Sequence, residues 1–204
     1  MVKMYKYEDK NYELALQKCM IELNETEENL YIKTEETEGK LFKSKKVILT
    51  VITKKSVKEY IKNYIQTIES SMGIEINSEI KEEEGIFNVI LVSNDNAILI
   101  GKDGRTLNAL QLLIRQALQT ETGFNIKVNL DAGNYKAKKI KNFEYKMKKI
   151  LKEVQETKVD VKLDPMNSYQ RRIVHNLANN FENITTCSEG LGSERHIVIH
   201  YKED

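Results

Sequence analysis

The segment Gly101-Lys102-Asp103-Gly104 places a basic side chain between two glycines, a pattern that suits contact with phosphate groups. Glycine has no side chain, so a phosphate backbone can come close to the turn, and the N–H groups that begin a following helix attract negative charge. Lys102 and the next basic residue, Arg105, add positive charge. The turn therefore predicts contact with a nucleic-acid backbone. A plain corner between two helices is the alternative interpretation.

A second polar constellation is the pair Arg171 and His175, which are four residues apart. On a helix this spacing places both side chains on one face, and we expect them to point outward. Arg171 could bind phosphate beside Arg195 from a neighbouring strand, while His175 could bond to the backbone or stack on a base. Two alternatives remain open, namely a salt bridge from Arg171 to Asp164 or Glu182, and a plain surface position for His175.

The remaining polar residues do not form a catalytic or metal-binding pattern. His196 and His200 are expected on one strand, separated by about 13 Å at ~3.3 Å per residue, which is too far to share a metal ion. Cys19 and Cys187 are distant in the sequence and lack the spacing of metal ligands. We expect no catalytic residue, no metal site and no cofactor, and hence no enzyme.

The composition is that of a globular protein without a membrane segment. The chain has 204 residues, of which 40% are hydrophobic and 31% charged, and its net charge is +1. Without an apolar run near the ~20 residues that cross a bilayer, and with a charged start, it is expected to stay in the cytoplasm without membrane insertion. The basic excess lies in residues 133–204, where one helix carries Lys136, Lys138, Lys139, Lys141, Lys146, Lys148, Lys149 and Lys152. Such a run is either a solvated face or a contact for an acidic partner.

The first 52 residues predict a small α+β unit without catalytic residues. The expected elements are a strand at 4–7, a helix at 11–23 and strands at 30–34 and 47–52. Ser56-Val57-Lys58-Glu59 then has the form of a capping box that starts a helix, and Gly73 ends it. Residues 53–55 are the only candidate for a hinge.

From residue 56 the patterns predict the order α-β-β-α-α-β. The expected elements are helix 56–72, strands 74–81 and 86–92, helix 95–100, helix 105–122 and strand 124–131. This order around the GxxG turn resembles a type II KH domain. The resemblance implies that Gly101, Lys102, Asp103, Gly104 and Arg105 grip about four nucleotides of single-stranded RNA, with apolar side chains of the flanking helices under the bases.

The last part predicts a long helix at 134–156, a strand at 159–163 and a helix that begins at Asn167, with Gln170 completing a capping box. An apolar seam runs along the long helix, at Ile140, Phe143, Met147, Ile150, Leu151 and Val154, and we interpret it as core packing. The Arg-x-x-x-His pair, with Asp164-Pro165-Met166-Asn167-Ser168-Tyr169 before it and Thr186-Cys187-Ser188-Glu189-Gly190 after it, resembles the R-three-H domain. That domain is associated with single-stranded nucleic acid.

Taken along its full length, the chain resembles the bacterial Jag (SpoIIIJ-associated) family. The resemblance implies an α+β fold of three small α/β-layered domains in series: a Jag N-terminal domain at 1–52, a type II KH domain at 56–132 and an R-three-H domain with its basic helix at 133–204. It implies a single-stranded-RNA-binding regulatory protein linked to cell elongation or cell-wall regulation. Implied partners are a small KH-domain protein or a second copy, and another protein at the N-terminal domain.

The sequence departs from the family pattern at two places. Gly39-Lys40-Leu41-Phe42-Lys43-Ser44 keeps only fragments of a glycine-rich turn. In the two binding domains, Asp103 stands where a basic or neutral residue is common, and His196 follows Arg195 where a second Arg is often seen. Both of the latter changes are expected to weaken attraction to phosphate. The competing hypothesis is a protein-interaction scaffold that uses the N-terminal domain and KH-mediated dimerisation and has little affinity for RNA. Gel filtration distinguishes the two hypotheses, because a tight dimer that is indifferent to RNA favours the scaffold.

Overall fold

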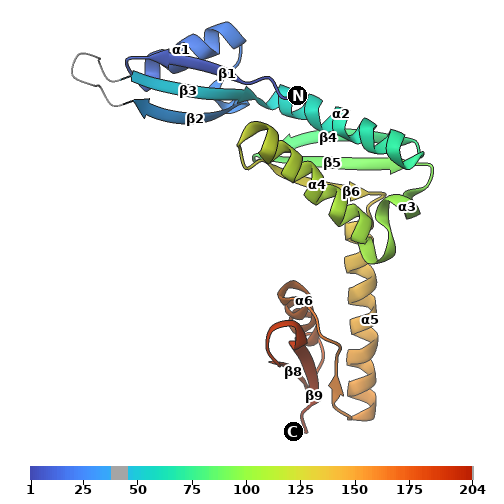
Figure 1. The fold of residues 1–204 in the computed structure, drawn as a ribbon. Helices are drawn as coiled ribbons and strands as arrows, with labels where there is room; N and C mark the ends of the chain where they lie inside the picture. Colours follow the sequence, from blue (N-terminus) through green and yellow to red (C-terminus); the bar gives the residue numbers. More distant parts are fainter. Residues whose placement is uncertain (38–45, 204) are drawn as a thin grey trace. The chain divides into compact units, whose positions relative to one another are not determined.

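The computed structural model describes residues 1–37 and 46–203, which form a mixed α/β fold with three three-stranded sheets (Figure 1). The predicted α+β class is confirmed. Internal contacts divide the chain into a first unit, Met1–Tyr135, and a second unit, Lys136–Asp204. The segment Gly39–Ser44, which departs from the family pattern, lies outside the described residues.

The N-terminal part of the first unit is one helix on a small antiparallel sheet. Its elements are β1 Tyr5–Asp9, α1 Tyr12–Leu23, a 3-10 turn Glu27–Asn29, β2 Leu30–Thr37 and β3 Lys46–Thr53, with β3 in the middle of the sheet. Asn11 caps α1, because its side chain accepts a hydrogen bond from the Leu14 N–H at 2.9 Å. The helix and the sheet enclose a core around Ala15, Cys19, Leu49 and Val51.

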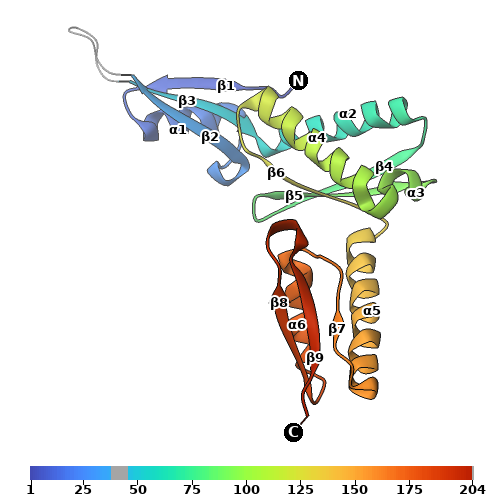
Figure 2. The same ribbon diagram turned by 60° about the horizontal axis from the view of Figure 1, so that its bottom comes forward.

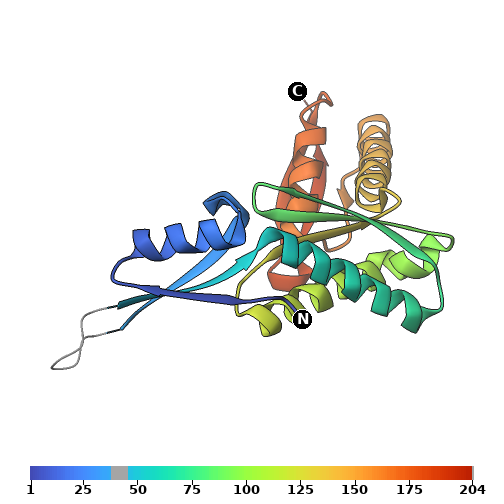
Figure 3. The ribbon, with the colours of Figure 1, turned by 90° about the horizontal axis from the view of Figure 1, so that it is seen from above.

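The second part of the first unit has the predicted order α-β-β-α-α-β. Its elements are α2 Lys54–Met72, β4 Ile76–Glu83, β5 Ile86–Ser93, α3 Asn96–Ile100, a 3-10 turn Lys102–Gly104, α4 Arg105–Thr122 and β6 Lys127–Ala132. β5 pairs with β4 antiparallel and with β6 parallel. Phe87, Val89 and Leu91 alternate with more exposed residues on β5, and α2 and α4 cover the apolar face that they form (Figure 3).

The junction between β3 and α2 differs from the prediction. Thr53 ends β3 and also caps α2, since its hydroxyl oxygen accepts a hydrogen bond from the Ser56 N–H at 3.1 Å. The helix therefore begins at Lys54, two residues before the predicted start, and the capping box proposed at Ser56 was wrong. Gly73 ends the helix as predicted, with a φ of 66°.

The two parts of the first unit share one hydrophobic core. Val2 and Ile52 are buried together with the apolar residues of the KH-like part. The Tyr31 ring also lies beside Phe87 and Phe124, with ring centroids 6.4 Å and 6.1 Å apart. Strand, cap and helix follow one another without a spacer, so residues 53–55 do not form a separate linker.

The outer edge of β6 is closed by side chains of α4. The Arg115 Nε–H donates to the Val128 carbonyl at 2.7 Å, and the Leu130 N–H donates to Gln111 Oε1 at 2.9 Å. α4 therefore satisfies backbone groups of the strand beside it as well as packing on the sheet.

The elements of the second unit are α5 Tyr135–Thr157, β7 Val161–Lys162, α6 Ser168–Ala178, β8 Ile184–Glu189, a 3-10 turn Gly192–Glu194 and β9 His196–Tyr201 (Figure 2). The first residue of α5, Tyr135, is the last residue of the first unit. The strand order is β7-β9-β8 and all pairs are antiparallel. Met147, Leu151 and Val154 of α5 are buried in the core of this unit, which confirms that the seam is core packing. The capping box of Asn167 and Gln170 is also confirmed.

Candidate nucleic-acid interface

The GxxG turn lies between α3 and α4 and is closed by backbone hydrogen bonds. Asp95 caps α3 by accepting from the N–H groups of Ala97 and Ile98. The Gly101 N–H donates to the Ala97 carbonyl at 2.8 Å and ends that helix, and the Gly104 N–H donates to the Gly101 carbonyl at 3.2 Å. The turn is therefore held by hydrogen bonds of the chain's own backbone.

Both glycines of the turn are required by the chain itself. Gly101 has φ 68° and ψ 178°, a region that is essentially limited to glycine. A Cβ atom at Gly101 would lie 2.1 Å from Thr106 Oγ1, and one at Gly104 would lie 2.5 Å from Tyr135 Cε1. Internal packing is thus one reason for the two glycines. The other is the reason suggested by the sequence, namely the close approach of a nucleic-acid backbone.

The two residues between the glycines of the turn, and the first residue of α4, are exposed. Lys102, Asp103 and Arg105 lie on the surface, and Asp103 adopts a φ of 57°, which aspartate tolerates. Gly104 occupies the N-cap position of α4, and a glycine cannot cap a helix with a side chain. The Arg105 N–H donates to the Lys102 carbonyl, and the N-cap residue supplies no side chain for the N–H groups that follow, which begin α4 next to two basic side chains.

Exposed apolar side chains lie on both helices that flank the turn. Ile98 of α3 is 46% exposed, and Leu112 and Leu113 of α4 are 55% and 48% exposed. Leu107 and Leu110, by contrast, face the core. The two helices therefore offer apolar surface of the kind that bases stack on.

Arg171 and His175 lie together on one face of α6, as their spacing predicted, but they do not simply point outward. The Arg171 Nη1–H donates to Ser188 Oγ at 2.7 Å, and His175 Nδ1 lies 2.7 Å from Thr186 Oγ1. Both side chains are half-buried against β8. The outward orientation expected from the sequence was wrong, because the strand supplies hydroxyl groups opposite the helix.

The hydrogen bond to Ser188 leaves part of the Arg171 guanidinium without a partner. Its Nε is buried and makes no hydrogen bond in the structure. A guanidinium offers five N–H donors, and one of them holds Ser188. The side chain is therefore fixed at one end and retains donors for a phosphate.

Arg195 is exposed and lies between the 3-10 turn Gly192–Glu194 and β9 rather than within a strand. Its carbonyl accepts a hydrogen bond from the Met166 N–H at 3.0 Å, so this turn is attached to the segment ahead of α6. The neighbouring His196 is buried, at 7% exposure, and its Nδ1 lies 2.8 Å from the Glu194 carbonyl oxygen. His196 is therefore not part of the exposed surface beside Arg195.

The basic face of α5 is largely solvated. Lys138, Lys141, Lys146 and Lys148 are exposed. Two further lysines have neighbours on the helix itself: Lys152 Nζ lies 3.5 Å from Glu156 Oε1, and Lys149 Nζ lies 4.7 Å from the centre of the Tyr145 ring. Contact with an acidic partner stays a prediction.

Sequence reasoning missed the groups that support the site. Thr186 and Ser188 hold His175 and Arg171, and Tyr135 closes the turn behind Gly104. Strand periodicity would have placed Thr186 and Ser188 on one face of β8, but their pairing with α6 depends on tertiary packing.

A GxxG turn between consecutive helices on a β4-β5-β6 sheet, followed by a unit with an Arg-x-x-x-His helix, defines a protein with a KH domain and an R-three-H domain. Residues 58–130 match the KH domain of KhpA/KhpB, and residues 144–201 match the R-three-H domain. In the described residues, no helix is long and apolar enough to cross a membrane.

Comparison with characterised proteins assigns the family. RNA-binding protein KhpB of Clostridium symbiosum is 32% identical over 200 residues, which cover 96% of this chain and 90% of that protein. RNA-binding protein KhpB of Bacillus subtilis is 31% identical over 199 residues, which cover 95% and 96%. The chain belongs to the KhpB family, and the resemblance to the Jag family is confirmed.

Proposed function

We propose that this protein binds single-stranded RNA through the GxxG turn of its KH domain and the Arg171–His175 face of its R-three-H domain. The observation that carries the proposal is the start of α4, where the N–H groups of an 18-residue helix have no side-chain cap and lie beside Lys102 and Arg105. A helix N-terminus with basic neighbours attracts phosphate.

Each site residue has a separate role in this proposal. Gly101 and Gly104 hold the turn in the shape that a sugar-phosphate backbone can approach, while Lys102 and Arg105 supply charge; Asp103 opposes it. In the R-three-H domain, Arg171 binds phosphate with its remaining donors, His175 contacts backbone or base, and Arg195 adds charge from the turn before β9. Two such sites on one chain strengthen binding through effective concentration.

The wider assignment rests on the family. We propose three functional parts, residues 1–52, 56–132 and 133–204, of which the first contacts another protein and the KH part contacts a small KH-domain protein or a second copy. We propose that the protein acts in the cytoplasm on RNA, without catalysis, and takes part in regulating cell elongation or the cell wall. The matching KH and R-three-H families, and relatives that are named as RNA-binding proteins, support the RNA part of this assignment.

Fluorescence anisotropy with labelled mixed-sequence RNA tests the proposal. We expect the full chain to bind single-stranded RNA, to bind less well as salt rises, and to bind a blunt RNA duplex more weakly, because the bases of a duplex cannot stack on protein side chains. A chain that elutes as a tight dimer and does not bind single-stranded RNA at low salt would instead support the scaffold hypothesis.

Asp103→Asn is expected to tighten RNA binding about threefold. A carboxylate about 6 Å from a phosphate in water contributes a repulsion of about 0.7 kcal/mol, and asparagine also tolerates the positive φ of this position. Anisotropy titrations at low salt measure the change. The matched control is Glu75→Gln, which removes an exposed carboxylate from the same unit. Equal effects of the two variants would show that Asp103 does not lie near phosphate.

A further inference from the structure

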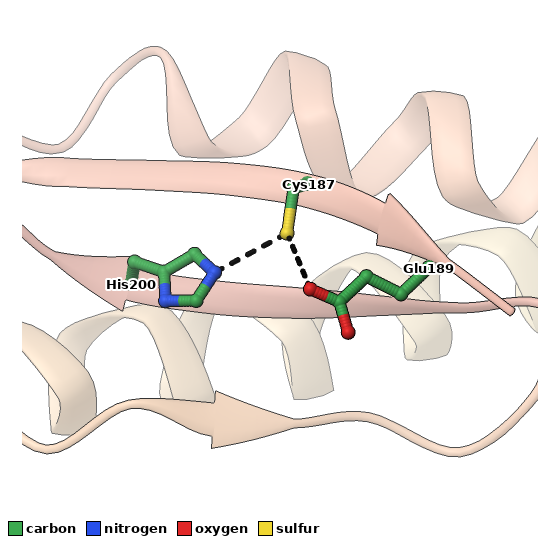
Figure 4. Close-up of side chains that lie close together, drawn as sticks. All are labelled: Cys187, Glu189 and His200. Carbon is green, nitrogen blue, oxygen red and sulfur yellow. Dashed lines mark hydrogen bonds between the residues drawn. The ribbon is translucent and has the colours of Figure 1, made fainter.

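Cys187, Glu189 and His200 form a compact group on the R-three-H sheet, away from its core (Figure 4). Strand alternation explains the location. Thr186 and Ser188 of β8 face α6, so Cys187 and Glu189 point to the opposite side of the sheet. On β9, Ile199 is in the core, and the next residue, His200, therefore also lies on the opposite face.

The distances in this group suit a metal ion. Cys187 Sγ lies 3.2 Å from His200 Nε2 and 3.3 Å from Glu189 Oε1, and the three atoms lie within 4.8 Å of one another. In a tetrahedral zinc site, with Zn–S of about 2.3 Å and Zn–N or Zn–O of about 2.0 Å, such ligand atoms are about 3.5 Å apart. Two of the three separations already have nearly this value. The third can shorten by rotation of Glu189, which is exposed at the end of β8.

Asp160 orients the histidine of this group. Its Oδ2 lies 2.6 Å from His200 Nδ1, and its Oδ1 accepts a hydrogen bond from the Tyr201 N–H at 3.0 Å. One carboxylate therefore contacts both the His200 ring and the backbone of the strand that carries it. The other ring nitrogen, Nε2, is left to face Cys187 Sγ. A carboxylate behind a histidine is the usual support of a metal-bound imidazole.

We propose that Cys187, Glu189 and His200 bind one Zn²⁺ ion, with Asp160 as the positioning residue and water as the fourth ligand. Binding forms one bond from zinc to each of the three side chains and releases the thiol proton of Cys187 to solvent. The ion would join β8 to β9 and, through Asp160, to the segment that enters β7.

The set of ligands selects zinc over the common hard cations. Mg²⁺ and Ca²⁺ prefer oxygen ligands, whereas thiolate and imidazole bind zinc strongly. A reactive cysteine is the other chemistry that a Cys–His pair can support. The Glu189 carboxylate lies 3.3 Å from the Cys187 sulfur, and a negative neighbour is the opposite of the basic surroundings that activate a reactive cysteine. Cys187 and His200 are only half-buried, so an ion can reach them from solvent.

Cobalt and zinc titrations of the full, reduced and chelator-stripped chain test the site. We expect one equivalent of Co²⁺ to produce sulfur-to-cobalt charge-transfer absorption and the intense visible bands of tetrahedral coordination, and Zn²⁺ to remove both. Cys187→Ser should abolish the charge-transfer absorption. Cys19→Ala, which removes the other cysteine of the chain, should leave it unchanged.

Two further variants separate ligation from folding. Glu189→Gln changes an exposed side chain and should weaken binding without altering the circular dichroism spectrum. Asp160→Asn should keep the absorption at saturating Co²⁺ but lower the affinity for Zn²⁺ by roughly 10- to 100-fold. Absence of the charge-transfer absorption in the unmodified chain, or its persistence in Cys187→Ser, would overturn the proposal. RNA binding is not part of these readouts, so either proposal can fail alone.

Discussion

Gly101→Ala is expected to destabilise the KH domain by about 2–5 kcal/mol, because it combines backbone strain with overpacking. The backbone of Gly101 has a φ of 68° and a ψ of 178°, where a Cβ atom is strained. The same Cβ atom would lie 2.1 Å from Thr106 Oγ1 and 2.8 Å from Thr106 Cβ, so a rotation of the hydroxyl does not relieve the contact. Hydrogen exchange of the segments around α3 and α4 measures the loss of protection locally.

Gly123→Ala is the matched control for this prediction. Gly123 ends α4 with a φ of 73°, but a Cβ atom there would have no neighbour within 4 Å. The control should cost about 1–2 kcal/mol, the cost of a left-handed conformation alone. If both variants lose protection equally, the close contact with Thr106 does not contribute, and the turn is more adaptable than its geometry indicates.

Replacement of Lys102 and Arg171 by alanine together is expected to have the largest effect on RNA binding. Each phosphate contact on a single strand contributes about 0.7 to the slope of log K against log salt, so the double variant should reduce that slope by about 1.4. Because the two changes affect different domains, their separate effects should be nearly additive in free energy on RNA long enough to occupy both sites at once. Anisotropy titrations at several salt concentrations measure the slope.

A charge-matched variant controls for net charge. Lys33→Ala/Lys202→Ala also removes one exposed basic side chain from each unit, but neither residue belongs to the proposed interface. Its slope should stay close to that of the unmodified chain. Arg171→Ala also removes the hydrogen bond to Ser188, so Arg171→Lys is a useful companion, because it keeps the charge. A slope that changes equally in both double variants would indicate a diffuse electrostatic effect and no specific contact.

The sequence was most informative where structure depends on neighbouring residues. The helix after the GxxG turn begins at Arg105 and ends at Thr122 as predicted, because the glycines at both ends act locally. The Asn167 capping box was predicted for the same reason. The start of α2 was not predicted correctly. Thr53 and Ser56 both suit an N-cap, and the end of β3 determines which of them is used.

Features that depend on strand pairing were not accessible from the sequence. Cys187 and His200 are 13 residues apart, and only the register of β8 with β9 brings them together. From the sequence, the exclusion of a metal site rested on two histidines along one strand and on the spacing of the two cysteines, and neither criterion detects a cysteine and a histidine that meet across two strands. The prediction that Arg171 points outward was wrong for a related reason. A helical repeat defines which residues share a face, but it does not tell which strand packs against that face.

The closed edge of β6 also determines how the KH sheet can grow. Strand addition by another chain requires an edge whose N–H and C=O groups are available, and Arg115 and Gln111 already occupy two such groups on β6. A strand added at β6 would have to displace both side chains, so this edge resists extension of the sheet. A fibre requires two adhesive edges on each molecule, so a resistant edge at β6 opposes polymerisation through this sheet.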